Sequence, residues 1–451
     1  MKILHYTLGL PPNRSGGLTK YATDLMVVQN NNGDEVSLLY PGDFTFWKQR
    51  KTQIVRLEKY QNIAVYEIEN PSTIPLLHGV REPEKIYESK TKFSVELMEV
   101  FYNEVQPDIM HIHTLMGLPL ELILFLKEKD VKIIFTSHDY YGLCMKVNFI
   151  NQKGDLCNSP NGLNCAICNR KAPSSLFLRL RNSSYLLRHK GRVSYRGNMK
   201  SDVPMTDTSD FPSNIESNKY DNLIKYFIGI LKLVDCFHYN SSISKEVYEN
   251  YLMPKKSKII PITHANIFDF RALKRFDKNH VKIGFIGSAS NYKGLPMLKE
   301  VLVELETENI SNWSLKVWGG GVGLDAECKK INYMGKYSSD ELETVFGGID
   351  LLIVPSIWKE TFSLITLESL SYGVPVLVTT NVGAKDIVKQ YNESFIIEPT
   401  RDALYNKLKL ILVDNVTLIE YNNKITSKSF DFGFEKHALE IKQLYNSVLN
   451  L

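Results

Sequence analysis

The chain has 451 residues, a length that is too great for one ordinary hydrophobic core and that predicts two domains. Its apolar fraction of 43% and charged fraction of 23% are typical of soluble globular proteins. The formal net charge of +4 is small for this length and does not indicate a nucleic-acid-binding protein.

The chain begins with a short apolar run that stops at Gly9, which is too short for a secretory signal. No stretch approaches the roughly 20 apolar residues that span a bilayer. We therefore expect a cytoplasmic protein, in which the six cysteines serve as metal ligands or core residues rather than as disulfides.

In the first half of the chain, short β-rich runs alternate with amphipathic helical patterns. The spacing predicts strands at 3–6, 36–40, 109–113 and 131–136, and helices at 18–29 and 120–127. Strands separated by helices of this length favour parallel βαβ units with right-handed crossovers. We therefore expect a Rossmann-like domain over residues 1–270.

Residues 144–219 interrupt this alternation. An insertion with four cysteines comes first (144–168), and a basic segment with a polar loop follows it (169–219). The Ser/Asp/Asn-rich run at 201–218 has too few apolar residues to bury, so it predicts a flexible loop.

The alternation restarts after a polar, basic stretch at 271–280, which predicts a linker. Strands are expected at 282–286, 315–318, 351–354 and 374–378, and helices at 295–306, 340–346 and 364–371. We expect a second doubly wound domain at 271–433 and a terminal helix at 434–451 that packs on the N-terminal domain. The predicted class is α/β, with two Rossmann-like domains facing across a cleft at the carboxyl ends of both sheets.

The most informative segment follows the strand at 351–354. It places Glu360 before a helix and Glu368 inside it. Thr361 and Ser363 are natural N-caps, and the free N–H groups near Phe362, Ser363 and Leu364 suit a phosphate. Glu360 would then face the group attached to that phosphate, and Glu368 would reach ribose hydroxyls. The alternative is a solvated helix with two ordinary surface glutamates.

This segment resembles the donor-binding signature of family 4 glycosyltransferases, which pairs two glutamates across seven residues and continues into a Gly-x-Pro-Val strand. Here that strand is Gly373-Val374-Pro375-Val376. The resemblance extends to the segments Gly16-Gly17, Pro107-Asp108-Ile109-Met110-His111-Ile112-His113, Thr136-Ser137-His138-Asp139, Phe285-Ile286-Gly287 and Lys293-Gly294.

The resemblance implies a GT-B fold, a nucleoside-diphosphate sugar donor and retention of anomeric configuration without a catalytic metal. It implies that Lys293 neutralises the diphosphate, Glu360 holds sugar hydroxyls and Glu368 holds the ribose. His138 would lie beside the anomeric carbon. For such a reaction the main task is to stabilise the charge on the leaving diphosphate, which a lysine and a helix N-terminus can do.

Gly16 and Gly17 match the glycine-rich donor loop of the family, where backbone N–H groups can approach an anion. The sequence departs from the family at Ser288, where an arginine usually forms a second diphosphate clamp. That departure removes about one charge-assisted contact, on the order of 1.5–3 kcal/mol. Arg14, beside the glycine loop, is a candidate substitute and could equally be a solvated surface residue.

The four cysteines of the insertion are Cys144, Cys157, Cys165 and Cys168. Four thiolates make a closed tetrahedral site that suits structural zinc. An iron–sulfur cluster would use the same ligands, and four unrelated thiols are the remaining alternative. Some members of the family that this chain resembles carry a similar insertion after the His-Asp segment.

Residues 169–200 contain basic and apolar side chains and no Asp or Glu. Such a segment can lie on an anionic membrane surface or contact an acidic acceptor such as a lipid diphosphate. An ordinary solvated helix packed on the N-terminal domain is an equal alternative. Nucleic-acid binding fits poorly, since no recognised motif accompanies the charge.

We therefore expect a retaining glycosyltransferase that moves a sugar from a nucleoside-diphosphate sugar to a glycan or lipid-linked acceptor in cell-surface polysaccharide synthesis. A GT-B phosphorylase or a sucrose/trehalose-type synthase that acts on soluble sugars is the second hypothesis. A non-catalytic partner subunit with a degenerate donor site is the third, because Ser288 replaces the expected arginine.

Overall fold

The computed structural model describes residues 1–44, 52–88, 93–183, 212–326 and 328–450. The chain divides into two compact units. The N-terminal unit contains residues 1–238, 248–258 and 442–451, and the C-terminal unit contains residues 239–247 and 259–441. The division therefore lies before the predicted boundary at 270, because residues 259–270 pack with the second unit rather than the first.

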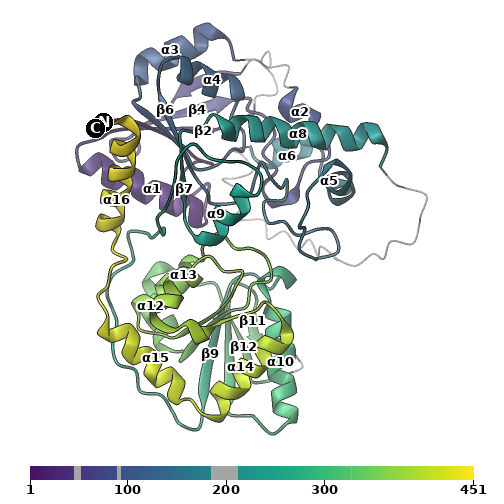
Figure 1. Cartoon of the computed structure of the whole chain (residues 1–451), viewed down its shortest axis with the longest axis vertical. Helices are drawn as coiled ribbons and strands as arrows, with labels where there is room; N and C mark the ends of the chain where they lie inside the picture. The colour runs from purple at the N-terminus through teal and green to yellow at the C-terminus, as the bar shows by residue number, and fades with distance from the viewer. Residues whose placement is uncertain (45–51, 89–92, 184–211, 327, 451) are drawn as a thin grey trace. The chain divides into compact units, whose positions relative to one another are not determined.

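The N-terminal unit is built on an eight-stranded sheet in the order β3-β4-β2-β1-β5-β6-β7-β8. Strands β2, β4, β6 and β7 of this sheet are labelled in Figure 1. The pairs on either side of the central strand β1 are parallel, and the edge strand β3 is antiparallel to β4. The central strands are buried along nearly their whole length, as expected for a sheet covered on both faces. The strand bounds are β1 Lys2–Tyr6, β2 Glu35–Pro41, β3 Gln53–Arg56, β4 Ala64–Glu69, β5 Ile109–Ile112, β6 Lys132–Thr136, β7 Cys236–Tyr239 and β8 Ser257–Ile259.

Helices connect these strands. Their bounds are α1 Gly17–Asn31, α2 Glu84–Tyr87, α3 Val95–Val105, α4 Leu120–Glu128, α5 Gly162–Asn169, α6 Ser175–Arg181, α8 Asn214–Lys232 and α9 Ser242–Glu249. The predicted loop at 201–218 is wrong at its C-terminal end, because α8 begins at Asn214. A capping box explains this start: Ser213 accepts from the backbone N–H of Glu216, and Glu216 accepts from the backbone N–H of Ser213. Residues 201–211 of that loop lie outside the described residues.

The C-terminal unit is built on a seven-stranded sheet in the order β11-β12-β10-β9-β13-β14-β15. All its described pairs are parallel except the edge pair β11–β12. The strand bounds are β9 Val281–Ile286, β10 Trp313–Trp318, β11 Val322–Leu324, β12 Ile331–Gly335, β13 Leu351–Val354, β14 Val376–Thr379 and β15 Ile396–Ile397. The helix bounds are α10 Leu295–Thr307, α11 Leu342–Gly347, α12 Leu364–Ser371, α13 Lys385–Asn392, α14 Arg401–Val413, α15 Val416–Ser427 and α16 Phe434–Leu449.

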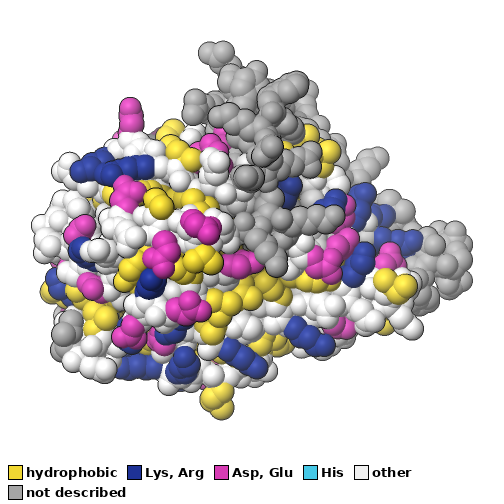
Figure 2. Space-filling model, turned by 90° about the horizontal axis from the view of Figure 1, so that it is seen from above, with side chains coloured by type: hydrophobic (Ala, Val, Ile, Leu, Met, Phe, Trp, Pro, Cys, Tyr) yellow, Lys and Arg dark blue, Asp and Glu magenta, His cyan; other side chains and the backbone are white. Residues whose placement is uncertain are grey.

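The predicted α/β class with two doubly wound halves is confirmed by these two sheets. The terminal helix α16 is shared between the units, since its residues from Lys442 onward belong to the N-terminal unit. Within the described residues, no helix has both the length and the apolar character that are needed to cross a membrane. On the face that Figure 2 shows, basic and acidic side chains are interspersed rather than gathered by sign.

Candidate functional site

The predicted donor segment of the C-terminal unit lies between β13 and α12. Its backbone is fixed to the end of β14, because Thr379 Oγ1 donates to the carbonyl of Ser356 at 2.7 Å and the N–H of Glu360 donates to the carbonyl of Asn381 at 2.8 Å. The segment therefore follows a buried strand and is held at the carboxyl edge of the sheet, where ligands of such sheets bind.

The structure brings Lys293 and Glu360 together. Lys293 Nζ lies 2.7 Å from Oε1 of Glu360, and Ser356 Oγ donates to Oε2 of the same carboxylate at 2.7 Å. Lys293 ends a short 3₁₀ turn and is followed by Gly294, which has φ = 81°. A Cβ at Gly294 would lie 2.0 Å from the carbonyl oxygen of Pro355, so only glycine lets this turn approach the donor segment.

Two aromatic side chains line the same site, and the sequence analysis did not single them out. Lys293 Nζ lies 5.2 Å above the ring of Trp358, which meets the ring of Tyr292 edge-on at 6.0 Å. The backbone N–H of Ile357 also donates to the carbonyl of Tyr292 at 2.9 Å. These contacts limit where the ammonium group can move, so it stays beside the carboxylate.

Glu368 lies on α12 with one carboxylate oxygen paired and the other not. His264 Nε2 lies 2.9 Å from Oε1. Oε2 is buried and has no hydrogen-bond partner among the residues that the structure describes. Burial, and to a smaller degree the charge of Glu368, raises the pKa of the nearby Tyr337 well above its usual value. A buried carboxylate oxygen without a partner is costly, and a ligand hydroxyl would satisfy it.

Helix α12 begins at Leu364, as predicted, and Ser363 is its N-cap residue. An N-cap side chain is expected to accept from a backbone N–H of the first helical turn, and Ser363 does not do so. Its hydroxyl oxygen accepts instead from Thr366 Oγ1 at 3.2 Å. Ser363 has φ = 90°, a left-handed conformation that costs a non-glycine residue about 1–3 kcal/mol. Phe362 is buried beside it, so this turn is rigidly packed.

The remaining predicted donor residues are placed as follows. Ser288 is exposed, and its Oγ lies 2.9 Å from Ser290 Oγ. Gly16, in the N-terminal unit, has φ = 110°, and a Cβ added there would meet no atom within 4 Å, so its turn faces open space. Arg14 Nη1 donates to Oδ1 of Asn182 at 3.2 Å, which gives this guanidinium a contact within its own unit.

His138 follows strand β6 in the N-terminal unit and is partly exposed. Its Nε2 lies 3.1 Å from Nδ1 of His113, a buried histidine that the sequence analysis did not assign to the site. Burial, and to a smaller degree the charge of His238, lowers the pKa of His138 to about 3. His138 is therefore neutral at physiological pH.

The four cysteines of the insertion lie in one region of the N-terminal unit. Burial, with smaller contributions from the neighbouring thiols, raises the pKa of Cys144 to about 11 and that of Cys165 further. Within the described residues, however, no three of the sulfur atoms lie within 4.8 Å of one another. A zinc ion holds each sulfur at about 2.3 Å, so sulfurs around it lie within roughly 4 Å of one another. The residue types fit a structural zinc site, which stays a prediction.

The described part of the basic segment contains α6. Leu178 of this helix is buried, whereas Leu176, Phe177 and Leu180 are exposed. Arg179 lies 4.9 Å above the ring of Phe44, so this basic residue packs on its own unit. Residues 184–200, which carry the rest of the predicted membrane-contacting segment, lie outside the described residues.

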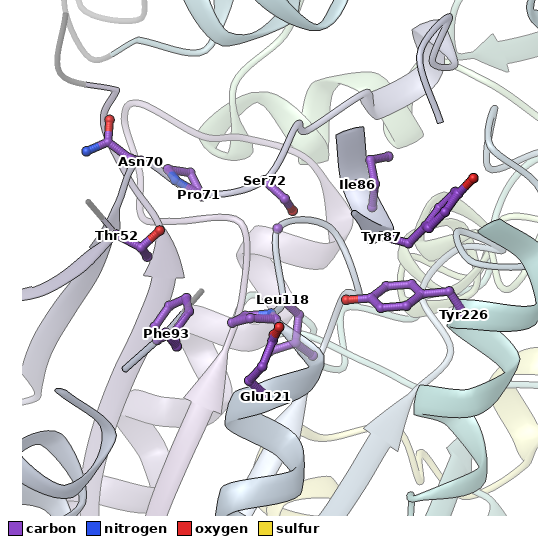
Figure 3. Close-up of a pocket in the computed structure, with 12 residues that line it drawn as sticks. Thr52, Asn70, Pro71, Ser72, Ile86, Tyr87, Phe93, Leu118, Glu121 and Tyr226 are labelled. Carbon is purple, nitrogen blue, oxygen red and sulfur yellow. The ribbon is translucent and has the colours of Figure 1, made fainter. Parts of the chain in front are cut away.

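A pocket in the N-terminal unit lies where loops after β4 and β5 meet α8 (Figure 3). Aromatic and polar side chains converge on it, among them Tyr87, Tyr226 and Glu121. These lining residues could not be predicted from the sequence, because they come from six separate segments that carry no common motif.

Comparison with known proteins finds a family whose model matches part of the chain. Residues 266–430 match the model of the family described as glycosyl transferases group 1. The matched segment lies within the C-terminal unit. The predicted family is supported at this level, whereas membership of a subgroup with a four-cysteine insertion stays a prediction.

Individual relatives are distant. A glycogen synthase of Finegoldia magna is 26% identical over 247 residues, which are 49% of this chain and 49% of the relative. An uncharacterized 41.2 kDa protein in the cps region of Klebsiella pneumoniae is 27% identical over 114 residues, which are 25% of this chain and 31% of the relative. The chain thus spans a third to a half of the length of these curated relatives.

The whole fold matches a solved structure. Anabaena HepE in complex with UDP and glucose aligns over 100% of this chain and 99% of its own, with a TM-score of 0.55 and 11% sequence identity. This likeness shows a GT-B fold, as the sequence predicted.

Proposed function

We propose that the chain is a retaining glycosyltransferase that moves a sugar from a nucleoside-diphosphate sugar to a glycan or lipid-linked acceptor. The observation that carries this proposal is the Lys293–Glu360 pair beside α12, whose Glu368 keeps a buried carboxylate oxygen unsatisfied. The relative from the cps region and the HepE complex with UDP and glucose support the proposal. The place of action that we propose is cell-surface polysaccharide synthesis at the cytoplasmic side of the membrane.

In the proposed reaction Lys293 balances the charge that develops on the leaving diphosphate, together with the N-terminus of α12. Glu360 accepts from hydroxyls of the donor sugar and holds Lys293 in place through their 2.7 Å contact. The free oxygen of Glu368 accepts from a ribose hydroxyl. The acceptor hydroxyl attacks from the face that the diphosphate leaves, and the departing phosphate oxygen takes its proton, so no carboxylate nucleophile is needed.

The four cysteines would hold one structural zinc ion in this proposal. Binding would draw their thiolates together and would stabilise the insertion without providing an open position for chemistry. An iron–sulfur cluster is the alternative occupant, because it uses the same ligands.

A synthase or phosphorylase that acts on soluble sugars is the second candidate, and the glycogen synthase relative favours it. A synthase would share the donor site and differ in the acceptor, whereas a phosphorylase would exchange the sugar with phosphate instead of a nucleoside diphosphate. A non-catalytic subunit is disfavoured, because Lys293, Glu360 and Glu368 are in place, although Ser288 replaces the second cation.

The test is calorimetric titration of nucleoside diphosphates into the wild type, Lys293→Ala and Glu368→Ala. Each substitution should weaken binding about 10- to 100-fold, because each removes one contact to a charged group. Lys389→Ala, which removes an exposed lysine of α13, is the matched control and should bind as the wild type does. Unchanged affinity in both site variants would contradict the donor-site assignment. Transfer assays with lipid-linked and with soluble acceptors are a separate experiment, which distinguishes the two candidate activities.

A further inference from the structure

A continuous chain of hydrogen bonds runs through the interior of the N-terminal unit and ends at His138. It connects, in order, His138, His113, His5, Gln29, Tyr445, His111, Thr136 and His238, with separations of 3.1, 3.0, 2.7, 3.1, 2.6, 2.6 and 2.8 Å between successive atoms. All of these side chains except that of His138 are buried. Strands β1, β5, β6 and β7 and helices α1 and α16 all contribute to it.

His5, His113 and His138 of this chain are neutral, which limits what each can do. Burial lowers the pKa of His5 to about 4, and burial together with the neighbouring histidines lowers the pKa of His113 well below its usual value. The rings of His111 and His113 lie only 4.2 Å apart between centroids, so a charge on either would repel a charge on the other. A neutral imidazole has one N–H donor and one acceptor nitrogen, so each ring passes on a single direction of hydrogen bonding.

The amide of Gln29 sets that direction. Its Oε1 faces His5, so His5 must donate from Nε2 and accept at Nδ1. His113 therefore donates from Nε2 and accepts at Nδ1, where His138 donates from its own Nε2.

On the other side, Gln29 Nε2 donates to the hydroxyl of Tyr445, which lies 2.6 Å from Nδ1 of His111. His111 Nε2 in turn lies 2.6 Å from Thr136 Oγ1, which contacts Nδ1 of His238 at 2.8 Å. Rotating the Gln29 amide by half a turn would reverse the bonds toward His5, so this one side chain selects the tautomers of His5, His113 and His138. The Tyr445 hydroxyl can accept as well as donate, so it does not pass a fixed direction to His111.

We infer that Gln29 is a positioning residue, which acts through His5 and His113 to hold His138 as the tautomer protonated at Nε2, with Nδ1 a hydrogen-bond acceptor. The inference rests on the proposed function for its consequence in catalysis. If His138 lies beside the donor sugar, the group that meets its Nδ1 must be a donor such as a sugar hydroxyl. His138 then helps to orient the sugar and supplies no proton to the leaving group.

The same histidines offer a competing explanation, because candidate ligand atoms of His5, His111 and His113 lie within 4.8 Å of one another. A metal ion there would need lone pairs that converge. All six nitrogens of these three rings already have a hydrogen-bond partner, so a metal would have to break the chain of bonds. The hydrogen-bonded arrangement therefore accounts for these residues better than a metal site does.

The test reads the tautomer directly. The full-length protein is labelled with ¹⁵N-histidine, and long-range ¹H–¹⁵N correlation spectra identify which ring nitrogen of each histidine carries the proton. The signals of His138 are assigned by their loss in His138→Gln. We expect Nε2–H for His138 in the wild type, and an Nδ1–H tautomer there would overturn the inference without any variant of Gln29.

Three substitutions then separate the arms of the chain. Gln29→Met removes the acceptor for His5 at similar volume, so His138 should become a mixture of tautomers. Gln29→Glu retains that acceptor, and Tyr445→Phe breaks only the arm toward His111, so both should leave His138 protonated at Nε2. If Gln29→Met folds and His138 keeps a single Nε2–H tautomer, the inference fails. It also fails if added zinc shifts the signals of His5 and His113, because a metal site would then explain these residues.

Kinetics distinguish this inference from the proposed function. Gln29→Met should lose turnover at an unchanged dissociation constant for the nucleoside diphosphate, and Gln29→Glu should restore much of that turnover. If His138→Gln turns over like the wild type, the role of His138 in transfer is wrong while the tautomer result still stands. If His138→Gln is impaired but Gln29→Met is not, the positioning role of Gln29 is wrong.

Discussion

Glu360 should matter for turnover more than for nucleotide affinity. Its two carboxylate oxygens accept from Lys293 Nζ and from Ser356 Oγ, each at 2.7 Å. Glu360→Gln preserves the shape and gives up the charge, and Glu360→Ala removes both contacts. In either variant the nucleotide would keep its proposed contacts with Lys293, Glu368 and the first turn of α12.

The magnitude follows from these contacts. A hydrogen bond to a charged group contributes about 1.5–3 kcal/mol, which corresponds to roughly 10- to 150-fold in rate if the contact orients the sugar in the transition state. Misplacement of a bound reactant by about 1 Å can itself cost about 10²-fold. We therefore expect Glu360→Ala to lower turnover about 10²-fold and Glu360→Gln to lower it less.

Turnover is measured by release of the nucleoside diphosphate, and its dissociation constant is measured by calorimetry on the same preparations. Glu393→Gln changes an exposed carboxylate of the same unit and should leave both quantities unchanged. If Glu360→Ala lost nucleotide affinity in proportion to its rate, Glu360 would be a nucleotide ligand and the placement of the sugar would be wrong. Equal turnover in all variants would make the segment a purely structural helix.

Further outcomes are expected from other parts of the molecule. Gly294→Ala should destabilise the C-terminal unit by about 1–3 kcal/mol or more, because Gly294 has a φ of 81° and an added Cβ would contact Pro355. Gly320→Ala is the control, because a Cβ there would meet no atom within 4 Å. Thermal melts should therefore show a lower melting temperature for Gly294→Ala than for Gly320→Ala. Elemental analysis should find about one zinc per chain, and reduced, folded protein without zinc or iron would refute a metal site. His5 and His138 have folded pKa values below 6.5, so between pH 6.5 and 4 they bind protons only after unfolding. The free energy of unfolding, measured by urea titration, should therefore fall as the pH falls from 6.5 toward 4. A free energy of unfolding that does not change with pH would contradict the neutral state of these two histidines.

Local patterns were sufficient to predict the elements around the donor segment. Buried strands such as β13 are continuous apolar runs, and α12 was predicted with its observed bounds. The start of α8 has a sequence signal, because Ser213 and Glu216 have the spacing of a capping box. The polar composition around them nevertheless led to the prediction of a loop.

The partners within the site could not be predicted in the same way, because they are distant in sequence. Lys293 and Glu360 are 67 residues apart, and His264 and Glu368 are 104 residues apart. Gln29 and Tyr445 are 416 residues apart, and neither has a neighbouring motif that indicates a polar role. Such contacts depend on which strands are adjacent, and strand adjacency is set by the tertiary fold rather than by local spacing.

The chain passes between its two units four times, after His238, Val247, Lys258 and Ile441. A fragment that stops at Lys258 would therefore lack the last ten residues of its own unit, including Tyr445. Gln29 Nε2 and Nδ1 of His111 would each lose the partner that they have in the full chain. Fragment complementation is the natural consequence: the first 258 residues should need the peptide 442–451, added separately or fused, to recover their native interior.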